Sequence, residues 1–258
     1  MAQSITSKRA PVSGTAVGPG RSRGTKRKPF LVDLYSTALG KKYVMAVTGI
    51  MMIGFVVFHM VGNLKMFIGA EDFNHYGEFL RELLVPIAPR TVVLWIMRVG
   101  LLAATLLHIH SAYGLTVINH KARGVKYQSP RDYQVANFAS RTMRWSGIIV
   151  TLFVLWHLAD LTWGTANAVG TEGTFVRGDP YGNLVRSFER VPVSLFYIVA
   201  NIALGIHLFH GVWSLFQSLG INNPRFNAWR RHLAVGIASL VVVGNVSFPV
   251  AVLAGVVG

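Results

Sequence analysis

The chain has 258 residues, of which 52% are hydrophobic and only 14% are charged, so it is too apolar for a water-soluble domain of this length. It contains no cysteine, which excludes disulfides and thiolate metal ligands supplied by the chain itself. The net charge of +15 at pH 7 comes from Lys and Arg in the N-terminal segment and at the ends of apolar runs. The composition therefore predicts a polytopic membrane protein and argues against a nucleic-acid partner.

The N-terminal segment, residues 1–30, is rich in Gly, Pro, Ser and basic residues and contains no apolar run. Such a composition cannot bury enough apolar surface to fold, so we expect a disordered cytoplasmic tail of a bacterial protein. Because the segment is Arg- and Ser-rich and free of acidic residues, an organellar transit peptide is the alternative. Residues 31–258 would then form one transmembrane domain.

Five apolar runs follow, and each is long enough as a helix to cross a hydrocarbon core of about 30 Å. Backbone exposed to lipid must satisfy its own hydrogen bonds, so helices are expected rather than strands. The predicted fold class is all-α, with the first four spans forming a cofactor-binding four-helix bundle. Amphipathic pieces at residues 29–43 and 71–84 are expected to lie along the two membrane interfaces. The five predicted spans cover about residues 44–64, 92–119, 145–164, 193–219 and 232–257.

The distribution of basic residues predicts the orientation of the chain. Nine Lys or Arg precede the first span, six lie between the second and third, and three lie between the fourth and fifth. The other two links each carry three basic residues, diluted by four and three acidic ones. The positive-inside rule therefore places the N-terminus in the cytoplasm and the C-terminus outside the bacterial inner membrane.

Six of the nine histidines fall within the first four spans, where a polar side chain is costly and points to function. His59 and His157 lie about 22 and 18 Å from the cytoplasmic start of their helices, and so in the outer half. His110 and His207 lie about 27 and 21 Å from the outer face, and so in the inner half. Two facing imidazoles at each level would suit the axial positions of a haem iron. The alternative is that each histidine hydrogen-bonds a neighbouring helix.

Two of these positions are ambiguous. His108 precedes His110 by two residues, about 200° around the helix, so both cannot face one cofactor. His210 shares a face with His207, so either could be a ligand while the other bonds a haem propionate or a quinone.

Arg98 and Asp160 are predicted to be buried charges at a similar outer depth. They would form an ion pair with each other, or Arg98 would bind a haem propionate while Asp160 exchanges protons with the outer side.

Four segments carry a resemblance to a known family: MAVTGIMMIGFVVFHMVGNLKMF, LLHIHSAYGLTV, RWSGIIVTLFVLWHLAD and GIHLFHGVWSLFQSLGI. They resemble the cytochrome b membrane-anchor subunit of succinate:quinone oxidoreductase, respiratory complex II, in its single-polypeptide five-helix form. The resemblance covers about residues 43–257. It implies a partnership with a flavoprotein that oxidises succinate and an iron–sulfur subunit that relays electrons to the anchor, which passes them to quinone.

The resemblance also implies one or two b-type haems with one axial ligand from each of the first four helices. The matching metal ligands are His59, His110, His157 and His207, where His110 is preferred to His108 because HSAYG fits the family pattern. Family pairing would join His110 with His207 and His59 with His157. The outer loop at residues 164–192 is longer than expected for the compact members of the family. The resemblance also implies that the complex could form a higher oligomer.

Three alternatives to haem-mediated electron transfer stay open. A haem-free anchor would use the histidines to bind helices or quinone. A His-ligated iron–sulfur cluster would take its thiolates from a partner, since a Rieske-type centre uses two His and two Cys. A transporter or proton channel would also bury His and Asp, although the chain shows no inverted repeat and only Pro249 lies well inside a span.

A quinone site needs polar donors at the edge of an apolar pocket. Besides His210, the candidates near the cytoplasmic side are Tyr35, Arg144, Trp145 and Ser146.

Overall fold

The structure is a computed structural model that describes residues 29–122, 138–167, 175–221 and 223–258. All regular structure in these ranges is helical, and five helices are long and apolar enough to cross a membrane, which confirms the predicted all-α polytopic fold. The predicted tail, apart from Pro29 and Phe30, lies outside the described residues. The five long helices are α2 (Ala38–Asn63), α4 (Val92–Lys121), α5 (Phe138–His157), α7 (Val191–Ser218) and α8 (Asn227–Leu253).

Short helical segments extend or connect these spans. A 3-10 segment, η1 (Leu64–Phe67), continues α2, and a π-helical turn, η2 (Leu158–Thr162), continues α5. A second 3-10 segment, η3 (Pro224–Phe226), leads into α8.

The segment before the first span differs from the prediction of one amphipathic piece through residue 43. Helix α1 (Phe30–Ser36) ends at Ser36, and α2 begins at Ala38. Thr37 separates them because its backbone is extended and its hydroxyl accepts a hydrogen bond from the Gly40 N–H at 3.0 Å, an N-cap of α2. A Cβ on Gly40 would collide with the Leu34 carbonyl oxygen, so glycine permits the close crossing of α1 and α2.

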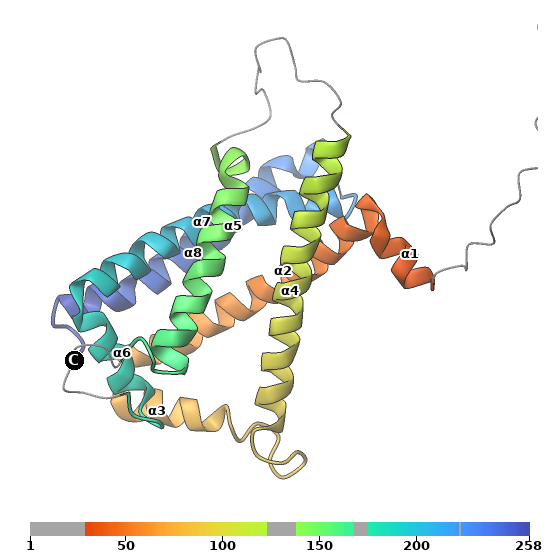
Figure 1. The fold of residues 1–258 in the computed structure, drawn as a ribbon. Helices are drawn as coiled ribbons and strands as arrows, with labels where there is room; N and C mark the ends of the chain where they lie inside the picture. The colour runs from red at the N-terminus through yellow and green to blue at the C-terminus, as the bar shows by residue number, and fades with distance from the viewer. Residues whose placement is uncertain (1–28, 123–137, 168–174, 222) are drawn as a thin grey trace, which may run out of the picture.

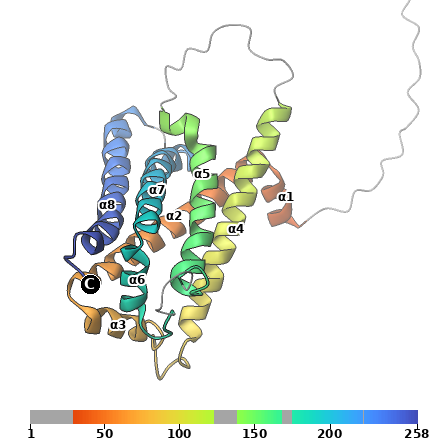
Figure 2. The same ribbon diagram turned by 60° about the vertical axis from the view of Figure 1, so that its left-hand side comes forward.

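The helices divide the molecule into two ends. In Figures 1 and 2, α7 and α8 run side by side, α5 packs across α7, and α4 crosses α2. Helix α1, the C-terminal end of α4 and the N-terminal end of α5 lie at one end, here called the α1 end. Helices α3 (Ala70–Phe79) and α6 (Pro180–Glu189), with the C-terminus, lie at the other, here called the α6 end.

Helix α6 lies within the segment that we expected to be a long loop, and that expectation is wrong. Asp179 caps its N-terminus by accepting from the Gly182 N–H at 3.0 Å, and Pro180 occupies the first turn, a favoured position for proline. Asn74 of α3 holds α6 in place, because its amide donates to Asp179 at 3.1 Å and accepts from the Tyr181 N–H at 3.0 Å. Helix α3 itself ends at Phe79, earlier than the predicted 71–84 piece.

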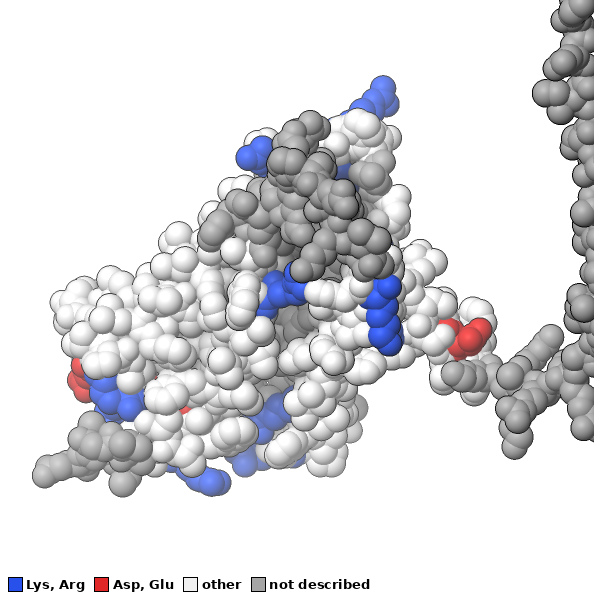
Figure 3. All heavy atoms as spheres, turned by 45° about the horizontal axis from the view of Figure 1, so that its top comes forward, with Lys and Arg blue, Asp and Glu red and all other residues white. Residues whose placement is uncertain are grey.

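Two apolar clusters hold the helices together. The larger lies at the α6 end and includes Met66, Phe73, Phe188, Tyr197 and Phe248. The smaller joins α7 to α8 through Leu204, Leu208, Ala238 and Val241. Figure 3 shows broad areas of surface without charged side chains, with Lys and Arg in small groups, as expected for helices whose sides face lipid.

The contact between α7 and α8 depends on a small residue. A Cβ on Gly205 would collide with Cγ2 of Val242, whereas a Cβ on Gly211 of the same helix would meet nothing within 4 Å. We expect Gly205→Ala to destabilise the protein by about 1–3 kcal/mol through overpacking, measured by thermal unfolding in detergent. Gly211→Ala is the matched control and should be neutral or slightly stabilising, and equal effects of the two substitutions would contradict this packing.

The cap of α6 gives a second prediction, on the effect of pH. Burial alone would raise the pKa of Asp179, but hydrogen bonds from Gly182 and Asn74 and the charge of Arg186 bring it below its ordinary value of 3.8. A lowered folded-state pKa stabilises the protein above pH 3.8, and this stabilisation is lost as the pH falls through the folded-state pKa. Asp179→Ala should cost about 1 kcal/mol at pH 7, with the difference from wild type shrinking below pH 3.8 in thermal unfolding. Asp179→Asn keeps a cap without the charge, so its pH dependence should be weaker than that of wild type, and a difference for Asp179→Ala that is constant with pH would count against this assignment.

Candidate functional site

Two histidines from different spans meet near the α6 end. The ring centroids of His59 on α2 and His157 on α5 are 5.9 Å apart, with the ring planes at 87°. Each histidine has a phenylalanine one turn earlier on the same face, because residues four apart are neighbours on a helix. Phe55 stacks on His59 at 5.2 Å and Phe153 lies 5.9 Å from His157. His157 is half-buried and His59 is exposed.

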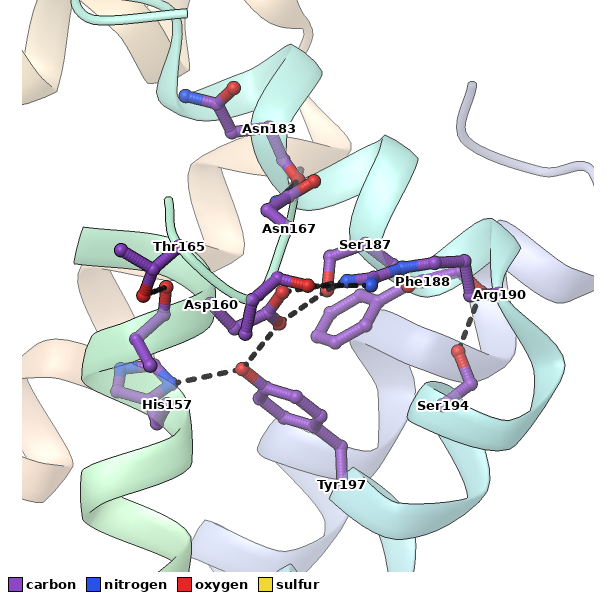
Figure 4. Close-up of polar contacts among 12 residues, drawn as sticks. His157, Asp160, Thr165, Asn167, Asn183, Ser187, Phe188, Arg190, Ser194 and Tyr197 are labelled. Carbon is purple, nitrogen blue, oxygen red and sulfur yellow. Dashed lines mark hydrogen bonds and ion pairs between the residues drawn. The ribbon is translucent and has the colours of Figure 1, made fainter. Parts of the chain in front are cut away.

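The turn after His157 carries a fully buried carboxylate (Figure 4). Asp160 Oδ2 accepts hydrogen bonds from the Ser187 hydroxyl at 2.5 Å and from the Tyr197 hydroxyl at 2.9 Å. Its Oδ1 accepts from Arg190 Nη2 at 2.6 Å, an ion pair in which Arg190 also donates to the Ala166 carbonyl at 2.9 Å. Three donors and one opposite charge thus compensate the burial of this carboxylate.

The predicted burial of Arg98 at the level of Asp160 is wrong, as is the ion pair between them. Arg98 is exposed and packs against Trp95, with its guanidinium carbon 5.2 Å from the ring centroid. Residue spacing predicts how far Arg98 lies along its helix, but not the direction in which that helix is turned. The partner of Asp160 is Arg190, which lies at the junction of α6 and α7.

Sequence reasoning missed Ser187, Arg190 and Tyr197. The start signal of α6, an Asp followed by Pro, was present in the sequence. It would have placed Ser187 and Arg190 three residues apart, at one end of a helix and on a shared face. The position of Tyr197 opposite Asp160 depends on how α5 and α7 pack, for which the sequence has no local signal.

A second polar group lies near the α1 end. The Tyr35 hydroxyl lies 2.5 Å from His110 Nδ1 and 3.1 Å from the Ser111 hydroxyl, and the Tyr35 ring stacks on His110. The Lys41 ammonium donates to the Tyr35 carbonyl at 3.1 Å and lies 4.1 Å from the centroid of the Tyr35 ring. Lys41 is buried, so a positive charge is fixed beside this tyrosine.

His108 faces a different side of α4 from His110. Its Nδ1 lies 3.1 Å from the Thr48 hydroxyl of α2, and a Cβ on Gly49 would meet its ring at 3.7 Å. His207 Nδ1 lies 3.2 Å from the Ser146 hydroxyl of α5.

The structure brings His207 within electrostatic range of both His108 and His210. Gly147 lies against the His207 ring, where an added Cβ would be 3.4 Å from Cε1. The two candidate histidines of α4 therefore differ in their surroundings: His108 lies toward His207, and His110 lies against Tyr35.

The polar residues considered for quinone binding do not form a single contact group among the described residues. Tyr35 contacts His110, Ser146 contacts His207, and Arg144 lies 3.4 Å from His120. Trp145 is exposed and His210 is half-buried.

Four imidazoles share one arrangement, in which Nδ1 faces a hydroxyl group from another helix. No hydrogen bond within the described residues involves Nε2 of any of these four rings, which is the nitrogen left for a ligand. In the same part of the chain, no group of three or more His, Asp or Glu could hold a metal ion together, so histidine pairs are the donor sets on offer. The four pairs of ring and hydroxyl are His108 with Thr48, His110 with Tyr35, His157 with Tyr197 at 3.5 Å, and His207 with Ser146.

Comparison with known proteins gives one match. Residues 126–246, from the link before α5 into α8, match the model of the family described as succinate dehydrogenase/fumarate reductase transmembrane subunit. No curated protein and no solved structure matches the chain. The match covers just under half of the chain and, together with the five candidate membrane spans, it supports a place for the chain in the family of succinate dehydrogenase/fumarate reductase transmembrane subunits.

Proposed function

We propose that this chain anchors a succinate dehydrogenase in the bacterial cell membrane and carries electrons from its iron–sulfur subunit to quinone through b-type haem. The family match supports the anchor role, and with it an iron–sulfur subunit and a flavoprotein as partners. The observation that carries the electron-transfer role is the set of imidazoles whose Nδ1 meets a hydroxyl of another helix while Nε2 has no hydrogen-bond partner among the described residues.

The donor set fits haem better than a metal ion bound by protein alone. Neutral imidazoles are the axial ligands that proteins commonly offer to haem iron. His59 and His157, whose ring centroids are 5.9 Å apart, are the two residues near the α6 end that would hold the group.

The proposed axial ligands are therefore His59 with His157 near the α6 end, and His207 with one histidine of α4 near the α1 end. The resemblance of HSAYG to the family pattern supports His110 as the fourth ligand. The position of His108 toward His207 supports the alternative. Gly49 and Gly147 lie beside the rings of His108 and His207, where an added Cβ would be 3.7 and 3.4 Å from Cε1.

Haem, when bound, supplies the one-electron redox chemistry. The chain would supply the imidazole nitrogens, places a hydroxyl at Nδ1 of His157, and packs aromatic side chains against His59 and His157 near the α6 end. Phe55 stacks on His59, while Phe153 and Tyr197 pack against His157, so each imidazole lies beside aromatic surface.

Quinone binding is proposed at the α1 end, which the positive-inside rule assigns to the cytoplasmic side. Quinone carbonyls accept hydrogen bonds, and Tyr35, Lys41 and Ser111 form a group of donors at the start of the first span. Ser146 and His210 lie near the neighbouring His207. Arg144 and Trp145 are better placed as anchors at the membrane interface, where basic and aromatic residues are common.

The reduced-minus-oxidised optical spectrum of the purified complex tests the haem proposal, with haem quantified per chain. We expect two b haems in the wild type and one in His157→Ala, with succinate:quinone activity impaired in the variant. His232→Ala, at the exposed start of α8, is the matched control and should keep both haems. A wild-type complex that is active without any haem would refute the proposal and leave quinone binding or a shared iron–sulfur cluster as the role of these histidines.

A pair of variants on α4 identifies the fourth ligand. If His110 is axial, His110→Ala should contain one haem fewer, while His108→Ala should keep both haems and lose only its contact with Thr48. The reverse result would assign the ligand to His108. Retention of two haems in both single variants would show that α4 supplies no axial ligand.

A further inference from the structure

We propose that Asp160 and Tyr197 fix the tautomer of His157, so that the proton is on Nδ1 and the lone pair of Nε2 is directed to the ligand position. The roles assigned are those of positioning residues, acting on His157 from outside the metal coordination shell. This inference rests on the proposed function for its consequence at a haem, but the tautomer itself is a property of the chain.

The first step is the direction of the hydrogen bond between Tyr197 and Asp160. A carboxylate only accepts hydrogen bonds, and a tyrosine hydroxyl carries a single hydrogen. The Tyr197 oxygen lies 2.9 Å from Asp160 Oδ2, so its hydrogen is donated there. Ser187 and Arg190 hold the carboxylate in place from α6, at 2.5 and 2.6 Å.

The second step concerns the contact between the same Tyr197 oxygen and the His157 ring. Once its hydrogen points to Asp160, Tyr197 can offer only lone pairs to His157. The facing nitrogen, Nδ1 at 3.5 Å, must therefore be the one that carries hydrogen. Because 3.5 Å is the upper limit of a hydrogen bond, the effect on the ring is chiefly electrostatic. A neutral imidazole protonated at Nδ1 has its lone pair on Nε2, and this lone pair is the metal-binding one.

The local backbone separates the two side chains. Asp160 lies within η2, a π-helical turn in which the Trp163 N–H bonds to the Leu158 carbonyl at 2.8 Å. Single π-helical turns of this kind are frequent at functional sites. Asp160 bonds to α6 and α7 (Figure 4). The His157 ring instead lies against His59 of α2.

The same logic applies to two other imidazoles. The Thr48 hydroxyl donates to the Val44 carbonyl at 2.7 Å, so it can only accept from His108 Nδ1. The Ser146 hydroxyl donates to the Met143 carbonyl at 2.9 Å, so it can only accept from His207 Nδ1.

At His110, by contrast, no such contact fixes the direction of the hydrogen bond between the Tyr35 hydroxyl and the imidazole. Tyr35 bonds both to His110 and to the Ser111 hydroxyl, each of which can donate or accept. His157 therefore differs from the other imidazoles, because a fully buried carboxylate, Asp160, sets the direction of the hydroxyl hydrogen beside it.

The experiment compares three variants of the intact complex by haem content and by redox titration of each haem. Tyr197→Phe removes the acceptor at Nδ1, which makes the imidazole a weaker donor. The midpoint potential of the haem on His157 should rise while that of the other haem stays unchanged. Tyr76→Phe controls for the loss of a tyrosine hydroxyl elsewhere.

Asp160→Asn gives the sharpest test because it reverses the direction of the chain of hydrogen bonds. Arg190 needs an oxygen, so the amide NH₂ would take the position of Oδ2 and donate to Tyr197. The Tyr197 hydrogen would then turn toward His157 Nδ1 and favour the tautomer protonated on Nε2. We expect loss of the haem held by His157, or a larger change in its potential than in Tyr197→Phe.

The nitrogen-15 chemical shifts of His157 test the tautomer in any preparation, with or without haem. In haem-free protein we expect hydrogen on Nδ1 in the wild type and on Nε2 in Asp160→Asn. Hydrogen on Nε2 in the wild type would overturn the inference, as would unchanged potentials in both Tyr197→Phe and Asp160→Asn. A wild type without haem but with hydrogen on Nδ1 would instead reject the proposed function and leave the tautomer assignment standing.

Discussion

A carboxylate within a membrane protein must be compensated by donors and opposite charge, and the α6 end is built around this requirement at Asp160. Its three donors come from α6 and α7, so satisfying one buried charge ties the end of α5 to both helices. Removing any one partner would leave part of a buried charge without compensation, which is costly in a medium of low dielectric constant. The apolar cluster around Phe188, Tyr197 and Phe248 surrounds this group and excludes water from it.

At both ends of the bundle a hydroxyl group from another helix contacts an imidazole, but different residues supply that hydroxyl. Near the α1 end, hydroxyl groups from Thr48 and Ser146 hold imidazoles while they donate to carbonyls of their own helices. Near the α6 end, the hydroxyl belongs to Tyr197 and its direction is set by a charge. Any helix offers a backbone carbonyl that can accept the hydrogen of a serine or threonine hydroxyl. The acceptor for Tyr197 is instead the Asp160 carboxylate, which needs donors from α6 and the charge of Arg190 to be stable when buried. An imidazole near the α6 end is therefore coupled to the packing of α6.

The positions of the spans could be predicted because length and apolar composition suffice for that purpose. The grouping of His59 with His157 by depth also followed from the rise of a helix. What sequence could not supply was the rotation of each helix about its axis, which is why Arg98 was wrongly expected to face Asp160. Helix α6 was missed because it is a short helix of mixed polar and apolar residues without a continuous apolar run. Its position depends on contacts with Asn74, more than 100 residues away in the chain.

The amide contact between Asn245 of α8 and Asn201 of α7, at 2.9 Å, has a consequence for the whole bundle. Sliding or rotating α8 by one residue would separate the two amides and leave polar groups unpaired in lipid. The pair therefore favours one register of α7 against α8 and one rotation of each helix about its axis. Tyr197 lies one turn before Asn201, and His207 lies less than two turns after it. Helix α8 carries no candidate ligand within its apolar part. Through this contact it nevertheless helps to fix the orientation of α7, and with it the positions of Tyr197 and His207.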